Sequence, residues 1–246
     1  MTTTSHPVRS RVVAVAAATI SLRESGDPAG PAAVLLHGGS SSSATWDRLA
    51  TALTAAGQHV IAADLRGHGG SSRTEDYPLH GYSDDIRDLM DALGIGSAAL
   101  VGHSLGGYAA SVLAQREPER VSRLILEEPG MPARDTESSH GLSGPRFLLP
   151  ALAGLAGHRG YDRRAVTSAV RQLRMPDPAW WDGLSLITAP TLLISGGPAS
   201  HIPPRKLAEA ARSIPHSRIV TIAAGHRAHS RRPEQFLAAV MPFLTQ

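Results

Sequence analysis

Short runs of apolar residues alternate along most of the chain with longer stretches in which apolar residues recur every three or four positions. The short runs are typical of strands buried on both faces, and they lie at 32–36, 60–63, 98–101, 121–126, 191–194 and 218–222. The longer stretches predict amphipathic helices at 46–56, 82–93, 105–116, 204–211 and 233–243. Ser83 and Ser104 stand where residues that start helices are expected. The alternation predicts an α/β fold with a parallel sheet covered on both faces and ligands at the carboxyl ends of its strands.

Two segments depart from this alternation. Residues 11–24 predict a pair of strands that leads through a turn rich in Gly and Pro into the first buried run. Residues 129–188 form an insertion of about sixty residues, which is too long for an ordinary connection and is typical of a lid or binding segment. We therefore expect a core domain of residues 1–128 and 189–246, with a cap of residues 129–188.

Composition narrows the chemistry that this fold can carry. The 246 residues include no cysteine, which excludes disulfides, thiolate metal sites and a cysteine nucleophile. The 24 basic residues nearly balance the 21 acidic residues, and no basic stripe with interleaved aromatic residues is present, so nucleic acid is not an expected partner. The apolar run 12–20 is too short to span a bilayer and is not followed by a cleavage site of small residues. These features predict a cytoplasmic protein that does not insert into membranes.

The sharpest chemical signal is a Gly-x-Ser-x-Gly motif at residues 102–106, directly after one predicted strand and at the start of a helix. In this context the motif predicts a nucleophile elbow, in which a tight turn exposes Ser104 at the edge of the sheet. Gly102 and Gly106 are needed because a side chain two residues from the serine would collide with neighbouring backbone. The amide of Leu105, at the start of the helix, can point at a developing oxyanion.

The expected general base is His226, which follows Gly225 after the last apolar run and precedes the terminal helix. That position brings an imidazole to the carboxyl edge of the sheet, where it can accept the serine proton and later return it to the leaving group. Other histidines compete for the role less well by position, namely His37, His68, His103, His201 and His229. His226 is therefore the first candidate.

Four short motifs follow one another along the chain, at residues 37–38, 64–71, 102–107 and 225–226. Together they resemble the α/β-hydrolase superfamily across nearly the entire chain. The resemblance implies a mostly parallel, eight-stranded sheet flanked by helices, a Ser–His–acid triad and an inserted cap. It also implies that Asp64 and His68 belong to a structural loop, and that Gly39 supplies a second oxyanion amide, with Ser40 as the next choice.

The position of the triad's acidic residue departs from the commonest pattern of the superfamily. Residues 195–201 occupy the usual place and contain no carboxylate. Some members carry the acid at the end of the strand that follows the nucleophile helix, and here that strand ends in Glu127 and Glu128. Adjacent strand residues point in opposite directions, so only one of the two can face the histidine. Glu128 is favoured and Glu127 is the alternative; if Glu127 faces away, replacing it with glutamine should have little effect.

These residues predict a serine hydrolase that cleaves a carboxylic ester or related acyl bond of a small molecule, without cofactor or metal. A biosynthetic acyltransferase, cyclase or lyase that uses the same serine is the alternative, as is a non-catalytic small-molecule-binding member of the fold. A serine at this position excludes the dehalogenase and epoxide-hydrolase branches, which attack with a carboxylate. The expected pocket is mostly apolar and includes Met131, Phe147, Trp180 and Trp181, although these residues can equally hold the cap in place. A monomer and a homodimer are both compatible with the sequence.

Overall fold

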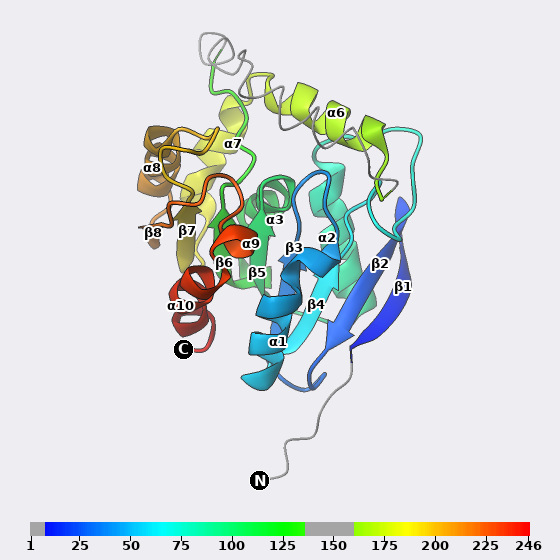
Figure 1. The fold of residues 1–246 in the computed structure, drawn as a ribbon. Coiled ribbons are helices and arrows are strands. Elements are labelled where there is room, and N and C mark those ends of the chain that lie inside the picture. Colours follow the sequence, from blue (N-terminus) through cyan, green and yellow to red (C-terminus); the bar gives the residue numbers. More distant parts are fainter. Residues whose placement is uncertain (1–7, 136–159) are drawn as a thin grey trace.

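A computed structural model of the chain describes residues 8–135 and 160–246 (Figure 1). Within these ranges the strands form one eight-stranded sheet in the order β1-β2-β4-β3-β5-β6-β7-β8. The strands are β1 (Arg9–Val15), β2 (Ala18–Ser25), β3 (Ala32–Leu36), β4 (His59–Ala63), β5 (Ala98–His103), β6 (Val121–Glu127), β7 (Thr191–Ser195) and β8 (Ser217–Thr221). β1 and β2 form an antiparallel hairpin, and β2 also pairs antiparallel with β4. Every other pairing is parallel.

Helices cover both faces of this sheet (Figure 1). The main helices are α1 (Asp47–Ala55), α2 (Gly81–Ala92), α3 (Leu105–Arg116), α6 (Arg163–Leu173), α7 (Pro178–Gly183), α8 (Pro204–Ser213), α9 (Ala228–Arg231) and α10 (Pro233–Leu244). Three short 3-10 turns accompany them in the described residues: η1 (Ser43–Trp46), η2 (Pro118–Arg120) and η3 (Leu184–Leu186). In these same parts of the chain, no helix combines the length and the apolar character that crossing a membrane requires.

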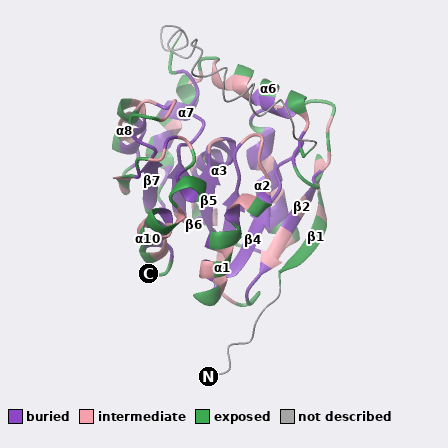
Figure 2. Ribbon diagram, viewed as in Figure 1, coloured by how far each residue is buried: buried purple, intermediate pink, exposed green. Residues whose placement is uncertain are grey.

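The core is divided by the sheet into two apolar layers, because successive strand residues point to opposite faces. In β3, Val34 and Leu36 pack into the layer shared with α2, α3 and α8. The intervening residues Ala33 and Leu35 pack into the layer shared with α1 and α10. Burial on both faces explains why the central strands are continuous apolar runs, and Figure 2 shows these strands as the buried centre of the molecule.

Most predicted elements match the structure to within about two residues. The start of α2 differs, because the helix begins at Gly81 with His80 as its N-cap residue and without a side-chain cap. A turn at residues 78–80 starts the helix instead: Gly81 N–H donates to Pro78 O and Ser83 N–H to His80 O. Ser83 is therefore carried into the first helical turn, where it is buried.

The described parts of residues 129–188 lie across the loops that follow the central strands. Val166 of α6 stands over Gly39, at 3.9 Å from the position that a Cβ on Gly39 would occupy. Asp162 N–H donates to Gly67 O after β4, and Ala133 N–H donates to Leu173 O at the end of α6. This segment therefore covers the carboxyl edge of the sheet, where the sequence places the chemistry. Its assignment as a separate cap stays a prediction, since residues 136–159 lie outside the described ranges.

We expect Gly106→Ala to destabilise the fold, because the added Cβ would lie 2.3 Å from Leu36 O and 2.6 Å from His37 O. Overpacking against backbone costs about 1–3 kcal/mol, occasionally more. Gly96→Ala is the matched control, since a Cβ there meets no heavy atom within 4 Å. Urea denaturation of both variants measures the effect, and equal stabilities would contradict this account of the turn.

Candidate active site

Ser104 stands in the tight turn between β5 and α3, with a left-handed backbone at φ +50°. A Cβ on Gly102 would lie 2.4 Å from Gly106 O, so the turn closes only with glycine at this position. The backbone of Ser104 is tied to β6 and the loop after it, because its N–H donates to Glu127 O and its carbonyl accepts from Gly130 N–H. The predicted strand–turn–helix context of the serine is present.

Within the described residues, three positions other than glycine have a positive φ: Ser40, Ser104 and Glu128. They directly follow or lie close behind β3, β5 and β6, which are neighbours in the sheet. A left-handed backbone at such residues costs of order 1–3 kcal/mol each and persists only where the surrounding structure imposes it. The strain is therefore gathered at one edge of the sheet, around the serine.

The loop after β3 passes directly beside the elbow. A Cβ on Gly38 would lie 2.6 Å from His103 Nδ1 and 3.1 Å from the Cβ of Ser104, so only glycine allows this approach. Ser40 N–H donates to His68 Nε2 at 3.3 Å, which engages the amide that was the second choice for the oxyanion hole. Gly39 therefore stays the first candidate, together with Leu105 at the first position of α3, where an amide has no partner within the helix.

Asp64 and His68 have structural partners, as the resemblance implies. Asp64 accepts hydrogen bonds from Ser43 N–H and Gly70 N–H, and the Nδ1–H group of His68 donates to Arg66 O. These contacts fix the loop after β4 against its neighbours. Nearby, His37 is fully buried, and this burial, with His68 beside it, lowers its pKa to about 3. The ring of His37 is therefore neutral.

His226 lies in the loop between β8 and α9, and its Nδ1 is 3.5 Å from Glu128 Oε2. The loop passes close to the end of β7: Gly225 N–H donates to Gly196 O, and a Cβ on Gly196 would lie 2.1 Å from Gly225 O. Burial lowers the pKa of His226 well below its usual range, and the nearby His201 and Arg227 lower it further. The imidazole is therefore neutral and can accept a proton.

Glu128 is completely buried and is held chiefly by the loop after β7. Gly196 N–H donates to Oε1 at 2.5 Å, and the hydroxyl of Ser200 donates to Oε2. Burial raises the pKa of Glu128, whereas these two hydrogen bonds act in the opposite direction. The loop that usually carries the acid thus contributes donors to a carboxylate on the neighbouring strand. No role for Ser200 was predicted from the sequence, although its position in the loop after β7 could have indicated that it lies near the site.

His201 is a second residue whose place the sequence did not reveal. Its ring centroid lies 3.9 Å from that of His226, so the two imidazoles are in contact. Burial lowers the pKa of His201, although the charge of Glu128 raises it. A neutral His201 can pack on His226 without electrostatic repulsion.

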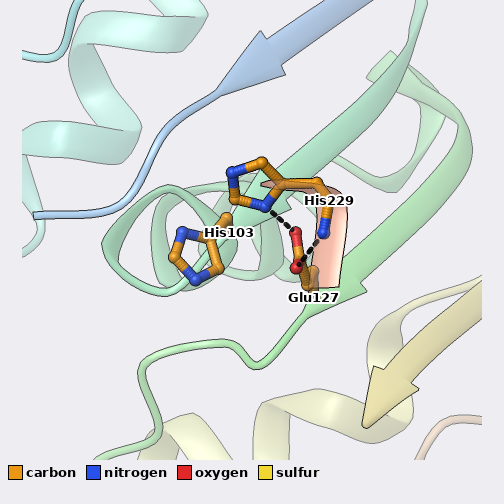
Figure 3. A group of neighbouring side chains, drawn as sticks. All are labelled: His103, Glu127 and His229. Carbon is orange, nitrogen blue, oxygen red and sulfur yellow. Dashed lines mark hydrogen bonds and ion pairs between the residues drawn. The ribbon is translucent and has the colours of Figure 1, made fainter. Parts of the chain in front are cut away.

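The carboxylate of Glu127 binds His229 and not His226, so the small effect that the sequence suggested for its replacement by glutamine no longer follows. Its carboxylate accepts hydrogen bonds from His229 N–H at 3.0 Å and from His229 Nδ1–H at 2.6 Å, as Figure 3 shows. His103, Glu127 and His229 offer ligand atoms within 4.8 Å of one another, which is the one such group in the described ranges. Both oxygens of Glu127 already have partners, and His103 Nε2–H donates to His226 O at 2.7 Å. The group is a hydrogen-bonded network rather than an open set of metal ligands.

The residues expected to line the pocket have definite places. Met131, Trp180 and Trp181 are buried, and Trp180 Nε1–H donates to Ser111 of α3. Trp181 Nε1–H donates to Pro132 O. Both indoles therefore help to anchor α7, and their contact with a substrate stays a prediction. Phe147 lies outside the described residues.

Comparison with known proteins identifies the family. Residues 31–156 match the family described as the α/β hydrolase fold, and the chain belongs to this family. An sn-1-specific diacylglycerol lipase from Mus musculus is 28% identical over 254 residues, covering 89% of this chain and 82% of the relative. An esterase from Mycobacterium tuberculosis is 30% identical over 245 residues, covering 85% and 81%. A hydrolase from Pseudomonas aeruginosa superposes with a TM-score of 0.81 at 25% identity, covering 96% of this chain and 98% of the other.

The buried histidines predict that stability falls as the pH is lowered below about 6.5. The folded state lowers the pKa of five of them: His37, His68, His103, His201 and His226. Below about pH 6.5 the unfolded chain therefore binds protons that the folded chain does not, and each such histidine removes up to about 1.4 kcal/mol of stability per pH unit. Urea denaturation between pH 7.5 and 5.5 measures this slope.

The variant His37→Gln should make the slope shallower, because glutamine does not titrate. The same replacement of the exposed His216 is the matched control. A stability that is constant between pH 7.5 and 5.5 would show that the folded chain takes up as many protons as the unfolded chain, which contradicts lowered pKa values for these histidines.

Proposed function

We propose that this α/β hydrolase cleaves carboxylic esters or closely related acyl bonds through an acyl-enzyme intermediate, with Ser104, His226 and Glu128 as its triad. The observation that carries the proposal is the contact between His226 Nδ1 and the buried Glu128, at the same edge of the sheet as the strained elbow serine. A histidine fixed through Nδ1 presents Nε2 for proton transfer, as the triad mechanism requires.

In the proposed first half-reaction, Ser104 Oγ attacks the acyl carbonyl carbon while His226 Nε2 accepts the hydroxyl proton. The amides of Gly39 and Leu105 donate hydrogen bonds to the oxygen that becomes negatively charged. The imidazolium then gives its proton to the departing alcohol as the bond to the acyl carbon breaks. In the second half-reaction His226 takes a proton from water while the water oxygen attacks the acyl carbon. The bond between that carbon and Ser104 Oγ then breaks, the imidazolium returns its proton to Oγ, and the carboxylic acid leaves.

The role proposed for Glu128 follows from its surroundings. The 3.5 Å contact with His226 is long for a hydrogen bond, and two donors from the β7 loop hold the carboxylate. Catalytic hydrogen bonds are often long without substrate and shorten in the reacting complex. We expect the contact to shorten when His226 gains its proton, because an ion pair in a buried site is stronger than a neutral contact.

The names of the relatives support acyl-bond cleavage. The mouse protein is named as a diacylglycerol lipase and the mycobacterial protein as an esterase, and both names describe hydrolysis of ester bonds. A mostly apolar site is compatible with such substrates, since Met131 and Val166 lie among the buried residues of the covering segment. The acyl chain length is best found with p-nitrophenyl esters of increasing chain length.

Ser104→Ala should lower kcat/KM for the best p-nitrophenyl ester by about 10³-fold or more, because the attacking oxygen is removed. It should also abolish covalent labelling by a fluorophosphonate probe while leaving the melting temperature nearly unchanged. His226→Ala should have a similar effect, and the double variant should lose little more, because the two residues act as one unit. Labelling of Ser104→Ala at the wild-type rate would exclude this serine as the nucleophile. Labelling of the wild type without ester hydrolysis would favour acyl transfer.

Glu128→Gln should lower kcat by roughly 10²–10⁴-fold. The neutral amide of glutamine lacks the negative charge that keeps the proton on His226 Nδ1 and stabilises the imidazolium. Glu209→Gln is the control, since Glu209 lies on α8 in a partly exposed pair with Arg134. Steady-state kinetics of both variants give the comparison. Full activity in Glu128→Gln would assign the orientation of His226 to another group.

Ala199→Asp should partly restore the activity of Glu128→Gln. Ala199 lies in the loop after β7, where its carbonyl oxygen is 3.5 Å from a Cβ built on Gly225, next to His226. A carboxylate introduced there stands at the commoner place for the acid. No gain in kcat over the single variant would show that this loop cannot present an acid to His226.

A further inference from the structure

A second carboxylate–histidine pair, Glu127 and His229, lies next to the proposed catalytic pair of Glu128 and His226. We propose that Glu127 and His229 are positioning residues that hold the loop carrying His226 at the distance from Glu128 that catalysis needs. The inference rests on the proposed function, because it assigns a role in the same reaction. It concerns residues that touch neither the substrate nor the reacting atoms.

The pair fixes the loop at the start of α9. Glu127 is completely buried at the end of β6 and accepts from both the backbone N–H and the Nδ1–H of His229 (Figure 3). At the other side of the ring, the hydroxyl of Thr45 lies 2.8 Å from Nε2 and donates to it. His229 therefore uses both ring nitrogens and its amide, which leaves it a single orientation.

His103 supplies a second attachment to the same loop. Its Nε2–H donates to the carbonyl of His226 at 2.7 Å, and its ring lies 4.7 Å from that of His226 and 5.0 Å from that of His229. The loop is thus tied down at residue 226 and again at residue 229. Only the second attachment depends on a charged group.

The position of Glu127 in the chain explains why this attachment matters for catalysis. Glu127 and Glu128 are consecutive, and the backbone N–H of Glu128 donates to Ile194 O. One rigid strand end therefore fixes both His229, through Glu127, and the carboxylate that faces His226. A shift of α9 relative to β6 changes the contact between His226 and Glu128 directly.

Glu127 is suited to this role because it stays charged in a buried place. Burial raises the pKa of a carboxyl group, but the nearby His103 and the hydrogen bonds from His229 lower the pKa of Glu127 below its usual range. A carboxylate that accepts two hydrogen bonds holds its donors more strongly than a neutral group does. Glutamine keeps the shape, but its NH2 group cannot accept one of the two bonds.

The test compares Glu127→Gln with Glu24→Gln in the same protein, because each of these glutamates pairs with a histidine. Glu24 on β2 accepts from His59 Nε2–H of β4 at 2.8 Å and from Arg11 at 2.8 Å, so the control removes the charge of a Glu–His pair away from the site. Glu127→Gln should lower kcat for a p-nitrophenyl ester about 10- to 100-fold with KM within about threefold. Glu24→Gln should leave kcat within about twofold.

Two variants of His229 test whether its hydrogen bond to Glu127 is what maintains kcat. His229→Ala should lower kcat as Glu127→Gln does, whereas His229→Asn should recover most of it, because the amide N–H of asparagine can replace Nδ1–H as the donor to Glu127. This pair of variants decides the question even if Glu127→Gln fails to fold.

Amide hydrogen exchange gives a readout that does not depend on turnover. Exchange at residues 226–229 should accelerate in Glu127→Gln and stay at the wild-type rate in Glu24→Gln. A wild type that neither hydrolyses esters nor reacts with a fluorophosphonate overturns the proposed function, while the exchange rates still decide whether Glu127 anchors the loop.

Three outcomes overturn the inference. The first is a Glu127→Gln enzyme with kcat within threefold of the wild type. The second is an equal loss in Glu24→Gln, which would show a general effect on stability. The third is a stoichiometric metal in the purified protein together with inactivation by EDTA, which would assign His103, Glu127 and His229 to metal binding.

Discussion

The site depends on the parallel pairing of β6 with β5 on one side and β7 on the other. In this register His103 lies opposite Glu127, and Glu127 lies opposite Ile194. The three strands consequently end at the same level, and the residues that follow them meet. Backbone hydrogen bonds continue the pairing past the strand ends, from Ser104 N–H to Glu127 O and from Glu128 N–H to Ile194 O. The spacing between Ser104 and Glu128, the proposed nucleophile and acid, is thus set by backbone geometry.

This arrangement explains how the proposed triad can do without a carboxylate in the loop after β7. A buried carboxylate needs hydrogen-bond donors, because its burial otherwise costs several kcal/mol. In this chain the loop supplies them through the amide of Gly196 and the hydroxyl of Ser200. β6 and β7 are neighbours, so an acid on either strand end can approach the same face of the histidine loop. In the proposed triad the end of β6 thus provides the carboxylate, and the loop after β7 provides its hydrogen-bond donors.

The sequence predicted what local pattern determines and missed what tertiary contacts determine. Apolar runs located the strands, and glycine spacing located the elbow, since both arise from neighbouring residues. The start of α2 was missed at Ser83 because a turn at 78–80 begins the helix instead. The sequence predicted two adjacent strand residues at Glu127 and Glu128, whereas β6 ends at Glu127 and Glu128 follows it with a left-handed backbone. The pattern also could not reveal that Glu127 binds His229. That partner lies 102 positions away in the chain and is brought near only by the fold.

The two glutamates at the end of β6 also limit how this segment can vary in length. Glu127 is the last residue of β6 and Glu128 follows it with a left-handed backbone, so inserting or deleting one residue in β6 would move both carboxylates away from their histidines. Neither set of donors could then be satisfied, whereas a substitution disturbs only one set. We therefore expect natural variants of this chain to tolerate length changes in the exposed turn around Gly94 and Gly96 far more readily than in β6.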